Sequence, residues 1–89
     1  MITRIASNPV FYAHDINGRP LVGGMLFTYE AGTSNPAPTY RDKYGTDLNT
    51  NPVVMDERGE CVIYLPSDKE YKFVLKDAEG SVIWEMDGI

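Results

Sequence analysis

The chain has 89 residues, of which 43% are apolar and 24% are charged, a composition typical of one small globular domain. Its formal net charge is −5 and no stretch clusters Lys and Arg, so nucleic-acid binding through phosphate neutralisation is not expected. No apolar run approaches the roughly 20 residues that span a membrane, and one cysteine, Cys61, cannot form an intrachain disulfide.

The N-terminal part predicts one short strand that ends in a turn. Residues 1–8 carry little pattern, and we expect a flexible arm or an edge strand there, followed by a single β domain over residues 9–89. An aromatic run at residues 9–15 predicts the first strand of that domain. Asn17-Gly18 then predicts a turn, because both residues tolerate a positive φ.

The middle of the chain predicts further short strands separated by loops. Apolar and polar side chains alternate over residues 25–30, which predicts a strand buried mainly on one side. Small and proline residues at 31–38 predict a loop. Strands are also expected at residues 53–55 and 60–65, with a glycine-ended turn at residues 56–59 between them.

Residues 71–86 predict a C-terminal β-hairpin around a turn at residues 77–80. Alternation places Val74 and Ile83 on one face of the hairpin and a larger apolar set on the other. The larger set is Tyr71, Phe73, Leu75, Val82, Trp84 and Met86. Because no segment has helical periodicity, the predicted fold is all-β. We expect a small β-sandwich or open barrel of about six to eight short, mainly antiparallel strands.

The sequence predicts no catalytic residue, metal site or cofactor. His14 is the only histidine, and nothing in the spacing pairs it with a nucleophile. Cys61 is expected on the inward face of its strand as a small apolar residue. The turn carboxylates do not match a calcium-binding loop, so we expect them to stabilise turns. The chain is therefore not expected to be an enzyme.

Several apolar and aromatic residues are candidates for a partner interface. Tyrosine is favoured at interfaces, and Tyr40 and Tyr44 fall in predicted loops. Val74 and Ile83 give the hairpin a second apolar face. The hairpin then has more apolar surface than one layer of a sandwich needs, and such a surplus is typical of an interaction surface. The candidate interface residues are Phe11, Tyr12, Tyr40, Tyr44, Val74 and Ile83.

The order of motifs resembles the N-terminal head-binding, or virion-anchor, region of tail fibres and tailspikes of tailed bacteriophages. A strand ending at Tyr29 is followed by a proline-containing loop that ends in Pro38-Thr39-Tyr40 and by the turn Asp42 to Gly45. Next come the segment Asn51 to Gly59, an aromatic strand and the hairpin with Trp on its return strand. The resemblance covers about residues 8–87.

This resemblance implies a β-rich structural adaptor that attaches a tail fibre or tailspike to the tail or neck of the virion. It also implies a homotrimer, other virion tail or neck proteins as partners, and a protein made in the host bacterial cytoplasm and located in the virion. An alternative remains open. Residues 18–23 loosely match transthyretin-like or carboxypeptidase-regulatory-like β-sandwich modules, which would bind carbohydrate or a peptide.

Overall fold

A computed structural model describes residues 10–66 and 68–89, and the arm expected at residues 1–8 lies outside the described residues. The described chain is a small all-β domain of six antiparallel strands in two sheets, which confirms the predicted fold class. The strands are β1 (Val10–Tyr12), β2 (Met25–Glu30), β3 (Val53–Val54), β4 (Glu60–Val62), β5 (Tyr71–Lys76) and β6 (Val82–Met86). No described segment forms a helix long and apolar enough to cross a membrane.

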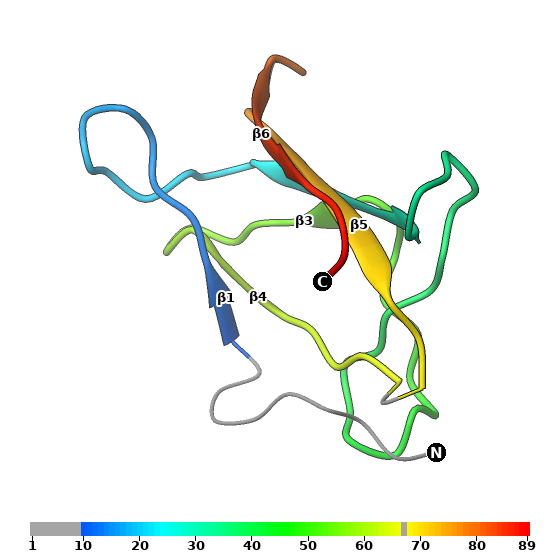
Figure 1. Cartoon of the computed structure of the whole chain (residues 1–89). Helices are drawn as coiled ribbons and strands as arrows, with labels where there is room; N and C mark the ends of the chain where they lie inside the picture. The colour runs from blue at the N-terminus through cyan, green and yellow to red at the C-terminus, as the bar shows by residue number, and fades with distance from the viewer. Residues whose placement is uncertain (1–9, 67) are drawn as a thin grey trace.

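The larger sheet has the strand order β3-β2-β5-β6, and β1 pairs with β4 in the smaller sheet (Figure 1). β2 and β5 form the longest ladder, from Met25 opposite Lys76 to Glu30 opposite Tyr71. β5 and β6 form the predicted C-terminal hairpin. β3 covers only the first two residues of β2, so the larger sheet has one very short edge strand and one longer edge strand, β6.

Of the four Asp-x-x-Gly motifs in the chain, the three that begin at Asp15, Asp56 and Asp77 share one hydrogen-bonding scheme. In each turn, Oδ1 of the aspartate accepts hydrogen bonds from the backbone N–H groups two and four residues later. The glycine has a positive φ and donates its N–H to the aspartate carbonyl at 3.0 Å. Because these bonds join residues at most four positions apart, each of these turns is fixed locally.

The core lies between the inner face of the larger sheet and the β1–β4 pair. Aromatic contacts join the two sheets: the ring centroid of Phe11 lies 6.4 Å from that of Phe73 and 6.1 Å from that of Trp84. Trp84 is partly buried against this core, as expected for a side chain on an edge strand. The buried apolar core residues are Ala13, Leu21, Leu26, Ala37, Val53, Met55, Ile63, Leu65, Tyr71, Phe73 and Leu75.

β2 turns its aromatic side chains away from this core. Leu26 and Thr28 are fully buried, whereas Phe27 and Tyr29 are half-buried on the opposite face. Thr28 is accommodated because its hydroxyl donates to the carbonyl of Ala37 at 2.7 Å. The side chain of Asn51 supports the same residue: its Oδ1 accepts from Thr28 N–H at 3.1 Å, and its Nδ2 donates to Thr28 O at 2.9 Å. The Asn51 amide therefore continues the pairing of β2 beyond the end of β3.

The hairpin faces follow the predicted alternation except at its turn end. Trp84 lies opposite Leu75 and Met86 opposite Phe73, on the core-facing side as expected. Val82 was expected on that side as well but pairs with Lys76 on the opposite face, so this part of the prediction is wrong. The physical reason is a β-bulge, in which Ile83 is an extra residue between the paired Val82 and Trp84 and reverses the alternation.

Candidate functional site

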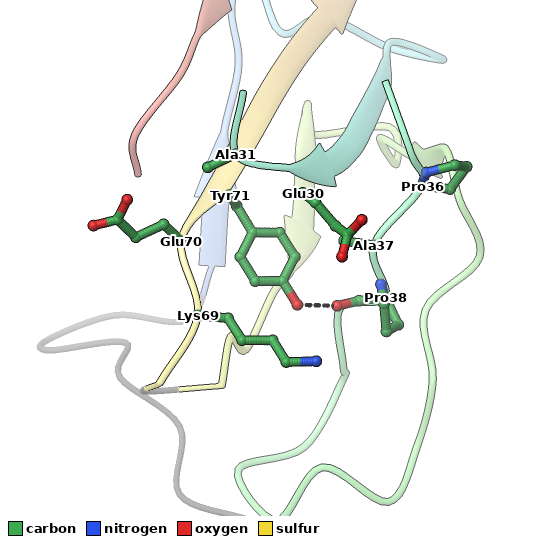
Figure 2. Close-up of a pocket in the computed structure, with 8 residues that line it drawn as sticks. All are labelled: Glu30, Ala31, Pro36, Ala37, Pro38, Lys69, Glu70 and Tyr71. Atoms are coloured by element: carbon green, nitrogen blue, oxygen red, sulfur yellow. Dashed lines mark hydrogen bonds between the residues drawn. The ribbon is translucent and has the colours of Figure 1, made fainter. Parts of the chain in front are cut away.

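A hollow of about 460 Å³ opens at the end of the β2–β5 ladder, where Glu30 pairs with Tyr71 (Figure 2). The loop that leaves β2 turns back along it, because Ala37 N–H donates to Thr28 O at 3.1 Å. The Tyr71 hydroxyl donates to the carbonyl of Pro38 and so ties β5 to the loop. The hollow is lined by Glu30, Ala31, Pro36, Ala37, Pro38, Lys69, Glu70 and Tyr71.

The wall of this hollow combines one buried aromatic ring with two proline rings and three charged side chains. The Tyr71 ring is 1% exposed and its hydroxyl is already bonded, so it offers neither a nucleophile nor an accessible acid. Pro36 and Pro38 present apolar rings and no N–H donor. In Figure 2 the Lys69 side chain runs beside the Tyr71 ring, whereas the Glu70 carboxylate points away from it.

A second hollow, of about 420 Å³, lies between the turn after β1 and the turn end of the β5–β6 hairpin. We call it the β6 hollow, and it is lined by His14, Asp15, Ile16, Leu21, Asp77 and Ile83. Ile16 is 99% exposed at the tip of the Asp15 turn, and Ile83 is the bulge residue of β6. The β6 hollow therefore has apolar walls and a rim that carries two aspartates.

The only histidine and the only cysteine of the chain do not line the same hollow. His14 lines the β6 hollow, whereas Cys61 lines a third hollow of about 350 Å³ beside β3 and β4. Desolvation by burial, with a smaller contribution from the negative charge of Asp56, raises the pKa of Cys61 to about 12. Its thiol therefore holds its proton at neutral pH. Within residues 10–66 and 68–89, no three His, Cys, Asp or Glu side chains are grouped to hold a metal ion.

The six candidate interface residues lie in different surroundings. Phe11 packs against the core, and its neighbour Tyr12 is exposed. Tyr40 is half-buried and bridges by its backbone to Leu48 and Tyr64. Tyr44 is exposed, and the Lys43 ammonium lies 5.2 Å from its ring centroid.

The last two candidates, Val74 and Ile83, belong to the hairpin. Val74 is only 9% exposed although it points away from the core, and it pairs with Phe27 on β2 and Glu85 on β6. Ile83 is exposed and lines the β6 hollow. The structure therefore places these two residues at different parts of the hairpin: one in the middle of the sheet, the other at the bulge.

The face of the larger sheet that points away from the core carries a mixed apolar and basic surface, which we call the outer face. The Lys76 ammonium lies 4.6 Å from the Phe27 ring centroid, and the Lys72 ammonium lies 5.2 Å from that of Tyr29. Lys72 also forms an ion pair with Glu85 at 3.8 Å. The outer face comprises Met25, Phe27, Tyr29, Val54, Lys72, Val74, Lys76, Val82 and Glu85.

The sequence indicated that Val74 lies on a second apolar face of the hairpin, but it did not indicate that Phe27 and Tyr29 of β2 belong to the same outer face. Apolar residues occur on both faces of the strand predicted at residues 25–30, so the sequence did not decide which face packs against the core. The lysines opposite β2 were the available clue, since Lys72 and Lys76 share a face with Val74 and must remain near water. Comparison with family models and with curated proteins gives no match for this chain.

Proposed function

We propose that this chain is a structural adaptor of a tailed-bacteriophage particle that joins a tail fibre or tailspike to tail or neck proteins, as a homotrimer. The observation that carries the proposal is the outer face, an apolar and aromatic sheet surface that the domain does not use for its own core. Val54 on this face is 57% exposed, and Phe27 and Tyr29 are half-buried, each with a lysine ammonium beside its ring. Surfaces of this kind mark protein–protein contacts.

The order of motifs along the chain supports the same function. The loop that ends at Tyr40, the segment from Asn51 to Gly59 and the Trp-bearing hairpin correspond to the phage virion-anchor pattern. The hollows add further support, since their walls combine apolar groups with charged rims and suit contact with another protein. A small core also favours association, because a chain of this length buries a limited share of its surface when it folds alone.

The proposal is tested by measuring the mass of the chain in solution and its binding to purified tail and neck proteins. We expect a mass three times that of the 10.0 kDa chain and retention of at least one tail or neck protein. Val54→Glu should reduce the assembly to monomers, because it places a carboxylate on the outer face. Val22→Glu is the matched control, since Val22 is 55% exposed and lies outside the outer face.

A strict monomer that retains no virion protein would refute the adaptor function. Binding of a monomeric chain to a glycan array would instead favour the carbohydrate-binding alternative. Loss of the trimer in both valine variants would show that the outer face is not its specific contact.

A further inference from the structure

β6 differs from the other described strands in having a long edge without a partner strand. It is the last strand of the larger sheet, it contains neither proline nor lysine, and its bulge is confined to the turn end at Ile83. The opposite edge strand, β3, is only two residues long. In the smaller sheet, the free side of β4 is partly occupied, because Asn49 Nδ2 donates to Val62 O at 2.9 Å. The β6 edge is therefore the longer of the two edges of the larger sheet at which another strand could be added.

The hydrogen-bonding direction of β6 follows from its contacts with β5. Tyr71 and Ile89 exchange both backbone hydrogen bonds, at 3.0 and 2.9 Å, so Tyr71 points its backbone groups toward the β6 side. Alternation along β5 then directs the backbone groups of Val74 toward β2. Glu85, which lies opposite Val74, consequently directs its N–H and C=O away from β5. These groups form the free edge.

The β6 hollow lies beside this edge and suits an apolar side chain. Ile83 belongs both to β6 and to the wall of the hollow. Ile16 on the facing wall is almost completely exposed, so it contributes little burial to the folded domain itself. Leu21 forms the buried floor. A strand added to β6 would bring its side chains next to this hollow and could bury Ile16.

Carboxylates outnumber basic groups around the β6 edge, where Lys72 of β5 pairs with only one of them, Glu85, at 3.8 Å. Residues 77–89 contain four carboxylates and no Lys or Arg, and Asp15 adds a further carboxylate at the rim of the hollow. A second copy of the same edge would bring this negative charge against itself, which opposes pairing. A segment with basic side chains would be attracted instead.

We propose that the β6 edge binds an extended segment of a partner protein as an additional antiparallel or parallel strand, in which apolar and basic residues alternate. One apolar side chain of this segment occupies the β6 hollow between Ile16 and Ile83, and the basic side chains face the surrounding carboxylates. Backbone pairing at Glu85 supplies affinity, and the hollow and the charge supply specificity. This inference rests on the proposed function in that it requires a partner protein, and it names the chemistry of the partner segment.

The test uses the full chain, labelled with ¹⁵N, and three end-blocked synthetic peptides. In these peptides lysine alternates with valine, glutamate alternates with valine, or lysine alternates with serine. We expect the lysine–valine peptide to bind, to protect the Glu85 amide from hydrogen exchange and to change the fluorescence of Trp84, the only tryptophan. The other two peptides should bind at least about tenfold more weakly, because each lacks either the opposite charge or the apolar side chain.

Three variants test the individual contacts. Ile16→Ser should weaken the lysine–valine peptide about tenfold with no loss of thermal stability, whereas Leu48→Ser, at another exposed apolar residue, should leave binding unchanged. Glu79→Lys should weaken it about fivefold, and Glu57→Lys, on a different turn, should not. Glu85→Pro removes the outward N–H and should abolish binding, and circular dichroism shows whether that variant is folded.

The inference is overturned if the acidic peptide binds as well as the basic one, or if the chemical-shift changes fall on the outer-face residues of β2 and β3 rather than on β6. It is also overturned if folded Ile16→Ser and Glu79→Lys bind like the wild type, or if the Glu85 amide is protected by self-association without peptide. The peptide experiment contains no virion protein, so a failure of the peptides to bind would not refute the adaptor function. Peptide binding together with no retention of tail or neck proteins would refute the adaptor function alone.

Discussion

Replacing Gly59 by alanine tests how closely the Asp56 turn approaches the segment that follows β1. Gly59 has a φ of +71°, and a Cβ at this position would lie 2.6 Å from the Ala13 carbonyl oxygen and 2.8 Å from the Leu21 backbone nitrogen. Both are backbone atoms, so neither can rotate away. The same groups form two hydrogen bonds, Ala13 N–H to Gly59 O at 2.8 Å and Leu21 N–H to Ala13 O at 3.0 Å.

The expected loss of stability has two parts. A positive φ costs a residue with a Cβ about 1–2 kcal/mol, and the lower entropy of the unfolded alanine chain offsets about 0.4–1 kcal/mol, which leaves about 1 kcal/mol. Moving the two segments apart weakens two hydrogen bonds of about 0.5–1.5 kcal/mol each. Gly59→Ala should therefore lower the free energy of unfolding by about 2–4 kcal/mol, a large share of the total for a domain of this size.

Gly18→Ala is the matched control. Gly18 holds the same place in the Asp15 turn and has a φ of +77°, but a Cβ there would meet nothing within 4 Å. This variant should lose only about 1 kcal/mol. Urea unfolding followed by the fluorescence of Trp84 measures both variants. Equal losses for the two glycines would refute the close approach, since the turn geometry alone would then explain the cost.

Three further predictions concern single side chains. Asn51→Ala removes both hydrogen bonds to the backbone of Thr28 and should cost about 1–3 kcal/mol in urea unfolding, whereas Asn35→Ala, at an exposed loop residue, should be nearly neutral. Since burial raises the pKa of Cys61 from 9.0 to about 12, its contribution to stability is complete below pH 9 and is lost as the pH rises toward 12. Cys61→Ala should remove this alkaline loss, and an equal loss in the variant would contradict the assignment. A hydrogen bond from the Thr46 hydroxyl and, to a smaller extent, one from the backbone of Asp47 lower the pKa of Asp42 below 3.8. The stabilising contribution of this carboxylate is therefore present above pH 3.8 and is lost as the pH falls through its folded pKa. Thr46→Val should move the NMR titration of Asp42 toward 3.8, and an unchanged titration would show that this hydroxyl is not the main cause.

The parts of the fold that could be predicted from the sequence are those fixed by local interactions. The turns at residues 56–59 and 77–80 were predicted because the aspartate and the glycine of each motif make the turn by themselves. The alternation in β5 likewise indicated Tyr71, Phe73 and Leu75 as core residues, and all three are buried. In each case the deciding residues lie within a few positions of one another.

The bulge at Ile83 and the support of Thr28 by Asn51 could not be predicted in the same way. A bulge adds one residue without changing the local composition, so Val82 was expected on the face of Trp84. Asn51 lies 23 residues from Thr28 along the chain, and only the completed sheet brings the two together. Both features result from pairing between strands rather than from the pattern within a strand.

The β6 hollow illustrates why a site on this domain is harder to predict than its strands. Its walls come from the Asp15 turn, from the Asp77 turn and from the bulge. In the sequence, Ile16 is a single apolar residue within a turn. A single exposed apolar residue is common on protein surfaces and does not by itself indicate a binding site. Ile16 and Ile83 come together only in the folded chain, where residues of the two turns line the same hollow.

The repeated Asp-x-x-Gly turn also bears on how such a domain can diversify. In these three turns the hydrogen bonds of the motif come from the aspartate side chain and from the backbone, and the side chains of the two middle residues contribute none of them. In this chain the middle pairs already differ in kind: Ile16 with Asn17, Glu57 with Arg58, and Ala78 with Glu79. A library that randomises these pairs would vary three exposed tips on one constant framework. The domain is therefore suited to display new recognition surfaces while its strands stay the same.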